Sequence, residues 1–402
     1  MPQILIVTNG ALCRNPRPWK EATTLGGAGY DVTVLTLRNH APSERYDQEL
    51  LRNAPFRAAA LDMLDRSRPG VLARRLRLWA ARQAATRLGR PTIHALGPAA
   101  ALLRRARQIP ADLTIVHNEV PHWVGLRLLA AGRRVAADIE DWHSEDLLPE
   151  ARRGRPVALL RETERALLQR ADYVSTTSHA LADALHHRYG GRHPEVIANS
   201  FPLQPDPRAG PPGDPPAFLW FSQTLGPGRG LEAFAGAWGR TKRPSRLVLL
   251  GQPYAGFDRR LEDAMPPTHR RAVAFRPLVT PADLPRVIAG HDLGLSLEDS
   301  QIPSRDLTIT NKLLQYLNAG LAVVATSTAG QREVLAHSPE AGQLIDLRDP
   351  AAAAAQLDGL LADPALLARR QAAARQLAVE SYCWERETPR LLALVAAALE
   401  TR

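Results

Sequence analysis

The sequence has little of what would mark several large classes of protein. Its 402 residues include two cysteines, Cys13 and Cys383, with no CxxC pair or Cys/His cluster. Neither a disulfide framework nor a zinc site is therefore predicted. The twelve histidines show no HExxH spacing or comparable ligand set, so we expect no obligatory metal.

Aromatic residues make up 5% of the chain, and no helix-turn-helix, zinc-finger or RNP-like pattern occurs. Nucleic acid is therefore disfavoured as a partner, although the net charge is +10. That charge favours phosphate-rich ligands or an anionic membrane surface. The chain is also rich in Ala and Pro, which indicates that part of the arginine excess is compositional.

Long apolar runs are missing as well. No stretch of about 18 uncharged apolar residues occurs, and the N-terminus enters the strand-like QILIVT directly, without the basic and apolar regions of a signal peptide. A cytoplasmic location is therefore expected.

What the chain does contain is an alternation of short apolar runs and helix-like segments from end to end. Runs such as QILIVT (3–8) and RVAADIE (134–140) are apolar on both faces, which predicts strands buried in a parallel sheet. In such doubly wound α/β folds, ligands bind beyond the carboxyl ends of the strands. The length exceeds one hydrophobic core and indicates two domains.

Residues 202–216, PLQPDPRAGPPGDPP, are dominated by Pro, Gly and Asp and are predicted to form a linker. We therefore expect a Rossmann-like domain over 1–201 and a second one over 217–378, facing a central cleft. The last segment, 379–402, is expected to form a helix that packs back on the first domain.

A glycine-rich loop, QTLGPGRG, opens the second domain between a strand and a helix. Gly226, Gly228 and Gly230 would let the backbone approach a ligand, and Arg229 lies near the helix N-terminus, where free N–H groups favour anions. The spacing is not that of the dinucleotide fingerprint. Two interpretations remain open: a phosphate site or a structural turn.

A second cation lies in TNKLLQYLNAGLAVVAT. Asn311 is predicted to cap a helix over 311–319, which puts Lys312 in the first turn, where an acidic side chain is usually preferred. The preceding loop leaves the carboxyl end of a strand, so Lys312 is expected at the same sheet edge as Arg229, an arrangement that suits a diphosphate. Alternatively, Lys312 is solvated or pairs with one of three acids: Glu298, Asp299 or Asp306.

Two further segments carry candidate contacts. The loop TNGALCRNPRPWKEA follows the first strand, so Asn15 and Arg17 are acceptor-side candidates, with helix capping by Asn15 as the alternative. Residues 68–90 place Leu72 and Trp79 at helical spacing among arginines. This pattern is typical of an interfacial helix on anionic lipid, or of a surface helix packed on the core.

The order of several segments resembles the GT-B fold glycosyltransferases, especially the large retaining family 4 of sugar-nucleotide-dependent enzymes. The second half matches through FSQTLGPGRGLE, RLVLLG, LVTPADLPRVIAGHDLGLSL and TNKLLQYLNAGLAVVATSTAGQREVL. The first half matches more loosely through NPRPWKEATTLGGAGYDVTVLT, VAADIEDWHSEDL and ADYVSTTSHALADALHHRYG. The resemblance covers most of the chain. It implies that the second half binds a nucleotide diphosphate sugar and the first half the acceptor.

The resemblance also assigns residues. It places Arg229 on the diphosphate, while Gln223 stands where an arginine is common, so Lys312 could supply the missing contact. Where the family has two glutamates eight residues apart, this chain has Leu307 and Gln315, which implies an atypical sugar pocket. The donor-binding candidates are Gly226, Gly228, Arg229, Gly230, Thr310, Asn311, Lys312, Gln315 and Glu333.

In the first half, Glu140 occupies the position of a family histidine near the reacting carbon, and His143 lies on the acceptor side. A carboxylate there could stabilise positive charge at the anomeric carbon or act as a base. The alternative is a structural role in a turn.

The resulting hypothesis is a retaining glycosyltransferase that uses a nucleotide diphosphate sugar as co-substrate, with no obligatory cofactor. Its acceptor would be a glycan or a lipid-linked hydroxyl in cell-surface polysaccharide or glycolipid synthesis, with peripheral contact to an anionic membrane. The alternatives are a non-catalytic nucleotide-binding module of the same fold and a sugar-nucleotide epimerase.

Overall fold

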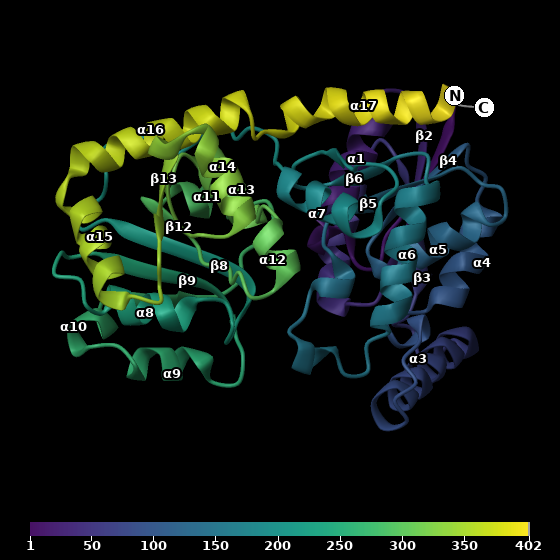
Figure 1. The fold of residues 1–402 in the computed structure, drawn as a ribbon, viewed down its shortest axis with the longest axis horizontal. Coiled ribbons are helices and arrows are strands. Elements are labelled where there is room, and N and C mark those ends of the chain that lie inside the picture. The colour runs from purple at the N-terminus through teal and green to yellow at the C-terminus, as the bar shows by residue number, and fades with distance from the viewer. Residues whose placement is uncertain (401–402) are drawn as a thin grey trace. The chain divides into compact units, whose positions relative to one another are not determined.

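The computed structural model describes residues 1–400, and the chain divides into two compact units. Unit 1 comprises Met1–Ile197 and the chain from Thr388 onward, and unit 2 comprises Ala198–Glu387. Each unit contains one all-parallel sheet with helices packed on it (Figure 1). The predicted fold class, α/β with two doubly wound Rossmann-like units, is therefore confirmed.

The sheet of unit 1 has the strand order β3-β2-β1-β4-β5-β6-β7. The strands are β1 (Gln3–Val7), β2 (Asp31–Arg38), β3 (Arg57–Asp62), β4 (Leu113–His117), β5 (Val135–Ile139), β6 (Val174–Thr176) and β7 (Glu195–Val196). Every residue of β4 and β5 is buried, as their apolar sequences require for the middle of a parallel sheet. The strand order reverses between β1 and β4, and ligands bind at such switch points.

Helices cover the sheet of unit 1 (Figure 1). They are α1 (Pro16–Gly27), α2 (Glu44–Leu51), α3 (Pro69–Arg87), α4 (Ala99–Gln108), α5 (Glu119–Leu129), α6 (Val157–Arg170) and α7 (His179–Tyr189). The last helix, α17 (Trp384–Glu400), contributes its part from Thr388 to this unit. There, Nη1 of Arg134 donates to the carbonyl of Leu399 at 2.6 Å.

The sheet of unit 2 has the order β10-β9-β8-β11-β12-β13, with its switch point between β8 and β11. The strands are β8 (Ala217–Leu225), β9 (Arg246–Pro253), β10 (Val273–Arg276), β11 (Leu293–Ser296), β12 (Ala322–Thr326) and β13 (Gly342–Ile345). Successive side chains of β8 enter different cores. Phe218 and Trp220 pack in one core cluster, and Leu219 and Phe221 in another, as the two-residue period of a strand dictates.

Two groups of helices close these cores of unit 2 (Figure 1). Those that contribute to the Phe218 core include α8 (Leu231–Trp238), α9 (Phe257–Asp263) and α15 (Pro350–Ala362). Those that contribute to the Leu219 core include α11 (Leu284–Ala289), α13 (Asn311–Ala319), α14 (Ala329–His337) and α16 (Pro364–Glu380). The sheet is thus apolar on both sides, which explains the unbroken apolar runs in its sequence.

Some elements differ from the sequence predictions. Strand β3 is alanine-rich and partly exposed at the sheet edge, so it lacks the β-branched signal of a buried strand. Helices α2, α10 (Pro267–Arg270) and α12 (Pro303–Leu307) are short and were also missed. Residues 202–216, predicted as a linker, lie within unit 2, where Nη2 of Arg208 pairs with Asp292 at 2.7 Å.

Candidate functional site

The glycine-rich loop of unit 2 lies at the switch point of its sheet, because it follows β8 and leads into α8. Gly230 has φ +74°, and a Cβ atom there would lie 2.7 Å from the carbonyl oxygen of Leu297. The position therefore requires glycine for two reasons, backbone conformation and close packing. As a result the loop is held against the carboxyl end of the neighbouring strand β11.

Three cations gather around this loop. Nη1 of Arg305, on α12, donates to the carbonyl of Gly228 at 3.2 Å, and Nζ of Lys312 lies 2.8 Å from Oε1 of Glu298. Burial alone would raise the pKa of Glu298, but Lys312 and then Arg229 and Arg305 outweigh it and lower that pKa. One carboxylate thus faces three cations, and the surplus positive charge favours binding of an anion.

Lys312 is mostly buried, and its Nζ atom lies 5.5 Å from the ring centroid of Trp220. Its pairing with Glu298 is one of the alternatives that the sequence left open. The predicted helix cap was wrong by one residue, because Thr310, not Asn311, accepts a hydrogen bond from the backbone N–H of Leu313. Thr310 has the extended conformation of an N-cap, whereas Asn311 is the first helical residue.

The remaining donor-side candidates lie on the helices that follow. Gln315, on α13, and Glu333, on α14, are both half-buried. The start of α14 packs on the segment after α12, since a Cβ atom at Gly330 would lie 2.4 Å from the carbonyl oxygen of Thr308. The assignment of these residues to a donor stays a prediction.

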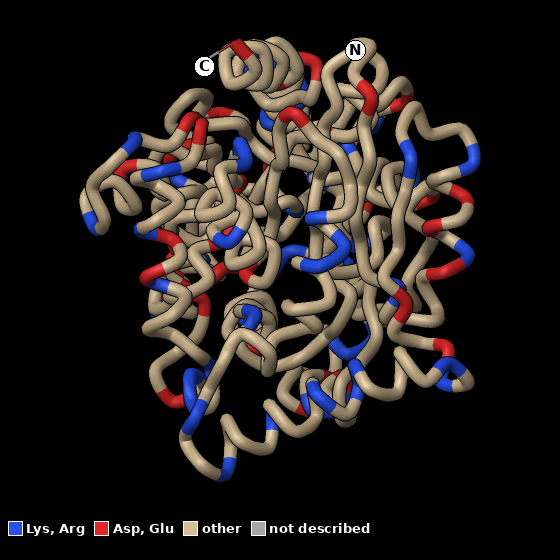
Figure 2. Tube along the Cα trace, turned by 90° about the vertical axis from the view of Figure 1, so that its right-hand side faces the viewer, with Lys and Arg blue, Asp and Glu red and all other residues tan. Residues whose placement is uncertain are grey.

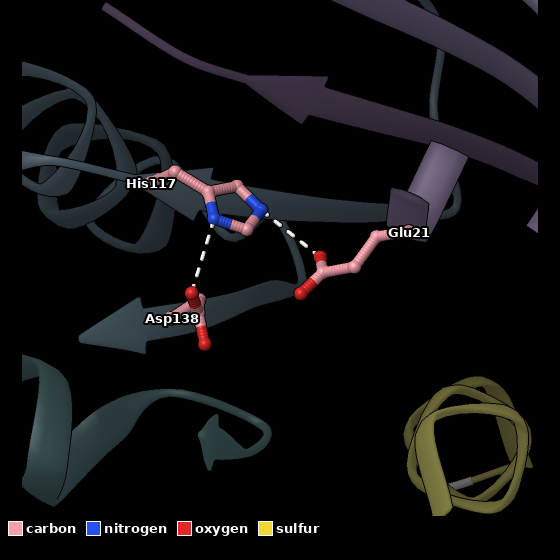
Figure 3. Close-up of side chains that lie close together, drawn as sticks. All are labelled: Glu21, His117 and Asp138. Atoms are coloured by element: carbon pink, nitrogen blue, oxygen red, sulfur yellow. Dashed lines mark ion pairs between the residues drawn. The ribbon is translucent and has the colours of Figure 1, made fainter. Parts of the chain in front are cut away.

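Unit 1 holds a different arrangement at its strand ends. Arg17 and Glu21, one turn apart on α1, meet His117 at the end of β4 and Asp138 on β5. Nε and Nη2 of Arg17 donate to the two carboxylate oxygens of Asp138 at 2.8 and 2.7 Å. The ring of His117 bridges the two carboxylates, with Nε2 3.0 Å from Glu21 and Nδ1 3.2 Å from Asp138 (Figure 3).

These four residues, called the buried ion network below, are at most 1% exposed. Burial lowers the pKa of a histidine, but the Glu21 carboxylate and the bond to Asp138 outweigh it and raise the pKa of His117 to about 10. Burial would raise the pKa of Asp138, yet the Arg17 guanidinium holds it well below its usual range. The network therefore contains two cations and two carboxylates at neutral pH.

Glu21, His117 and Asp138 each offer a ligand atom within 4.8 Å of the others, a spacing that a metal ion could use. However, Arg17 already donates two hydrogen bonds to Asp138, and its Nε atom lies 3.3 Å from Glu21. A divalent ion would have to approach this guanidinium in a buried space, which is electrostatically costly. The charge-balanced ion network is the better description of these residues.

Glu140 follows directly after β5 and is half-buried. Burial, then the neighbouring Asp141, raises the pKa of Glu140 to about 7, while Arg17 opposes the shift. His143 lies three residues further on, with Nδ1 3.7 Å from a carboxylate oxygen of Glu119.

The other two acceptor-side candidates have structural contacts. The amide nitrogen of Asn15 donates to Thr8 at 2.7 Å and to Asn118 at 3.1 Å, which ties together the loops after β1 and β4. Asn15 stands at the N-cap position of α1 without a side-chain capping bond. Arg17 is fully buried in the ion network, so a direct contact with an acceptor would require that network to open.

A second buried cluster holds the segment after Glu140. Glu164, on α6, accepts hydrogen bonds from Trp142 at 3.2 Å and from the hydroxyl of Ser144 at 2.7 Å. Tyr189 donates to the same carboxylate at 2.7 Å. Sequence reasoning missed Glu21, His117 and Glu164. The only local signal was the four-residue spacing of Arg17 and Glu21 on one helix.

Two family models match the chain. One, described as Glycosyl transferases group 1, matches residues 215–363, and the other, Glycosyltransferase Family 4, matches residues 21–204. A search of curated proteins finds no significant match.

Solved structures share the fold over nearly the whole chain. Sucrose-phosphate synthase from Thermosynechococcus elongatus is 16% identical, with a TM-score of 0.73 over 98% of both chains. HepE from Anabaena, in complex with UDP and glucose, is 16% identical, with a TM-score of 0.71 over 99% of this chain and 100% of HepE. WaaG, a glycosyltransferase involved in lipopolysaccharide biosynthesis, is 15% identical, with a TM-score of 0.63 over 98% and 99%.

At these identities the solved structures establish the fold, and the two family models establish the class. The chain belongs to the GT-B glycosyltransferases, which confirms the resemblance seen in the sequence. The donor, the acceptor and the stereochemical course stay predictions.

Proposed function

We propose that this glycosyltransferase moves a sugar from a nucleotide diphosphate sugar to a hydroxyl of a glycan or lipid-linked acceptor, with retention of anomeric configuration. The observation that carries the proposal is the group of three cations, Arg229, Arg305 and Lys312, around the glycine-rich loop of unit 2. A diphosphate is the ligand whose charge and size match several cations beside a helix N-terminus.

In this proposal the three cations bind the diphosphate and stabilise the negative charge that develops on the leaving nucleotide. Gln315 and Glu333 would contact the nucleoside and the sugar. The side chain of Leu307 has no polar atom that could bind the sugar. The hydroxyls of the sugar would therefore be bound by other groups of the loop that contains α12. The UDP and glucose bound by HepE are ligands of this class and are the first ones to test.

Glu140 is the proposed catalytic residue of unit 1. A carboxyl with a pKa near 7 is partly ionised at neutral pH, as required of a group that gives up or accepts a proton there. As a carboxylate, Glu140 would stabilise positive charge at the anomeric carbon or remove the proton of the acceptor hydroxyl. Asn15 and His143 are proposed on the acceptor side.

Donor binding is tested by thermal shift with a panel of UDP, GDP, ADP and CDP. We expect at least one of them to raise the unfolding temperature, because a ligand that binds the folded state stabilises it. R229A and K312A should reduce the shift, whereas the control R286A, an exposed arginine on α11 of the same unit, should not. Identical shifts for all four proteins would contradict the proposed donor site.

Turnover separates an enzyme from a non-catalytic module of the same fold. We expect slow release of nucleoside diphosphate from the sugar nucleotide whose nucleotide gives the largest thermal shift, and abolition of this release in R229A. Binding without any release would favour the non-catalytic module, and an epimerised sugar nucleotide as the product would favour an epimerase.

We also propose that helix α3 makes the peripheral membrane contact. Leu72, Leu76 and Trp79 lie one turn apart on this helix and are 50%, 64% and 59% exposed, so they do not pack on the core. Arg77 and Arg87 are exposed on the same helix, which suits an anionic lipid surface. Among the residues that the structure describes, no helix is long and apolar enough to cross a membrane.

The 51 Lys and Arg residues of the chain are accompanied by 41 Asp and Glu residues. In the view of Figure 2, Lys and Arg positions are interspersed with Asp and Glu rather than gathered in one block. The proposed membrane contact combines the exposed apolar side chains of α3 with its arginines.

The membrane contact is tested by flotation with vesicles of phosphatidylcholine alone or with phosphatidylglycerol. The triple variant Leu72→Ser, Leu76→Ser, Trp79→Ser should lose binding to the anionic vesicles, whereas Leu278→Ser, a 50% exposed leucine of unit 2, should bind like the wild type. Equal binding of the triple variant and the wild type would contradict the role of α3.

A further inference from the structure

The buried ion network lies directly before the proposed catalytic carboxyl in the chain. Asp138 lies on β5 (Val135–Ile139), and Glu140 is the first residue after that strand, two positions beyond Asp138. Asp138 is bound on three sides: by Arg17, by His117 and by the hydroxyl of Ser175, which donates at 2.7 Å. Its backbone carbonyl also lies 2.8 Å from Nε2 of His122.

The segment after Glu140 is anchored as well. The hydroxyl of Thr177 donates to the carbonyl of Glu140 at 3.3 Å, and Trp142 and Ser144 are bound to the buried carboxylate of Glu164. Glu140 therefore stands between two buried anchors, one on each side in the chain. A backbone that is fixed on both sides of a catalytic residue places its side chain without ordering the chain when a substrate binds, which is a condition for preorganised catalysis.

We propose that the buried ion network is a positioning device for Glu140, in which Arg17, acting through Asp138, holds the end of β5 and His117 completes the charge balance. The inference rests on the proposed catalytic role of Glu140. Arg17, His117 and Asp138 are thus positioning residues. In this proposal they act through the position of Glu140 and do not contact the donor or the acceptor.

The charges around Glu140 make the inference testable by pH. Asp141 and Asp138 disfavour the ionised form of Glu140, whereas Arg17 on α1 and His117 on β4 favour it. Removing a cation should therefore raise the pH at which Glu140 ionises, and removing Asp141 should lower it. If the network only stabilised the fold, neither substitution would change the pH at which Glu140 ionises. Each would change only the amount of folded enzyme.

The experiment measures kcat/KM against pH for the sugar nucleotide that the wild type hydrolyses fastest. The wild-type rate should rise with pH about a midpoint near 7. H117Q should move this midpoint up and D141N should move it down, each by about one pH unit. D183N, which alters an exposed aspartate on α7, should leave it unchanged.

Arg17→Lys keeps the positive charge but loses the bidentate hydrogen bond to Asp138. The variant should therefore keep the wild-type midpoint and KM, while its kcat falls about tenfold or more. Circular dichroism confirms that each variant is folded, and thermal shift with the nucleotide confirms that donor binding is intact.

Three results would overturn the inference, and they differ in which other proposals they contradict. If Glu140→Gln is inactive but H117Q keeps the wild-type midpoint, the network does not act on Glu140, and the proposed function stands. If Glu140→Gln keeps the wild-type rate, both the catalytic assignment of Glu140 and the inference built on it fail. A metal-dependent rise in unfolding temperature that H117Q abolishes would also overturn the inference, in favour of a metal site.

Discussion

The strand ends of unit 1 and those of unit 2 differ in how their charged side chains are balanced. In unit 1, two cations and two carboxylates pair with one another in a space that is closed to water. In unit 2, three cations surround one carboxylate, and Arg229, Arg305 and Lys312 are all partly exposed. The charges of the first set balance one another, whereas the second set has more cations than carboxylates.

This difference follows from what burial does to a charge. A fully desolvated ion is stable only when its partners are inside the protein with it, so the network of unit 1 is suited to hold a structure in place. Unpaired cations that remain partly exposed to water destabilise the fold only slightly. They attract an anion and contribute to its binding. The comparison distinguishes a region whose charges pair with one another from a region that is proposed to bind an anion.

The largest expected effect comes from breaking the closed network. R17M leaves Glu21 and Asp138 with a single buried cation, so the free energy of unfolding should fall by about 3–5 kcal/mol. The control R229M removes a partly exposed cation of unit 2 and should change it by no more than about 0.5 kcal/mol. Urea unfolding measures both values, and equal losses would remove the distinction between the two regions.

The network should also make stability depend on pH. The pKa of His117 is raised in the folded state, from 6.5 to about 10, so its contribution is complete below about pH 6.5 and is lost as the pH rises toward 10. Between about pH 7 and pH 9 we therefore expect the unfolding temperature to fall by several degrees. Thermal unfolding of H117Q should show a shallower dependence, and an unchanged slope would contradict the assigned charge of His117.

In unit 2 the sensitive feature is the backbone of the loop. Gly228 and Gly230 both have positive φ, so alanine at either position costs about 1–2 kcal/mol of backbone strain. G230A adds a clash with the carbonyl of Leu297, whereas a Cβ atom at Gly228 meets nothing within 4 Å. G230A should therefore reduce both stability and nucleotide binding more than G228A does, as thermal shift with and without nucleotide will measure.

The smallest expected effect concerns the single acid of the cation group. E298Q removes the carboxylate that Lys312 pairs with and leaves the cations more strongly positive. We expect nucleoside diphosphate to bind about 2- to 5-fold more tightly, the range of a weak charge interaction, and with a steeper dependence on salt. Titration calorimetry at two KCl concentrations measures this, and weaker binding would mean that Glu298 serves mainly to orient Lys312.

More of the candidate site could be predicted from the sequence in unit 2 than in unit 1. The glycine-rich loop, Arg229 and Lys312 could be proposed from the sequence because each stands in a local pattern, namely a flexible turn or a helix start. The buried ion network was not found, since His117 and Asp138 are single polar residues at the ends of apolar strands. In the sequence alone, such a residue cannot be told from one that faces water.

The sequence by itself determined the alternation of strands and helices, the two sheets and the family, because periodicity and motif order are properties of neighbouring residues. Only the tertiary structure decided that Arg17 meets Asp138, 121 positions away in the chain, and that Lys312 pairs with Glu298 beside Arg229. Strand order brings these residues together, and charge pairing depends on which strand ends become neighbours. That information resides in the packing of the whole unit, not in any local segment.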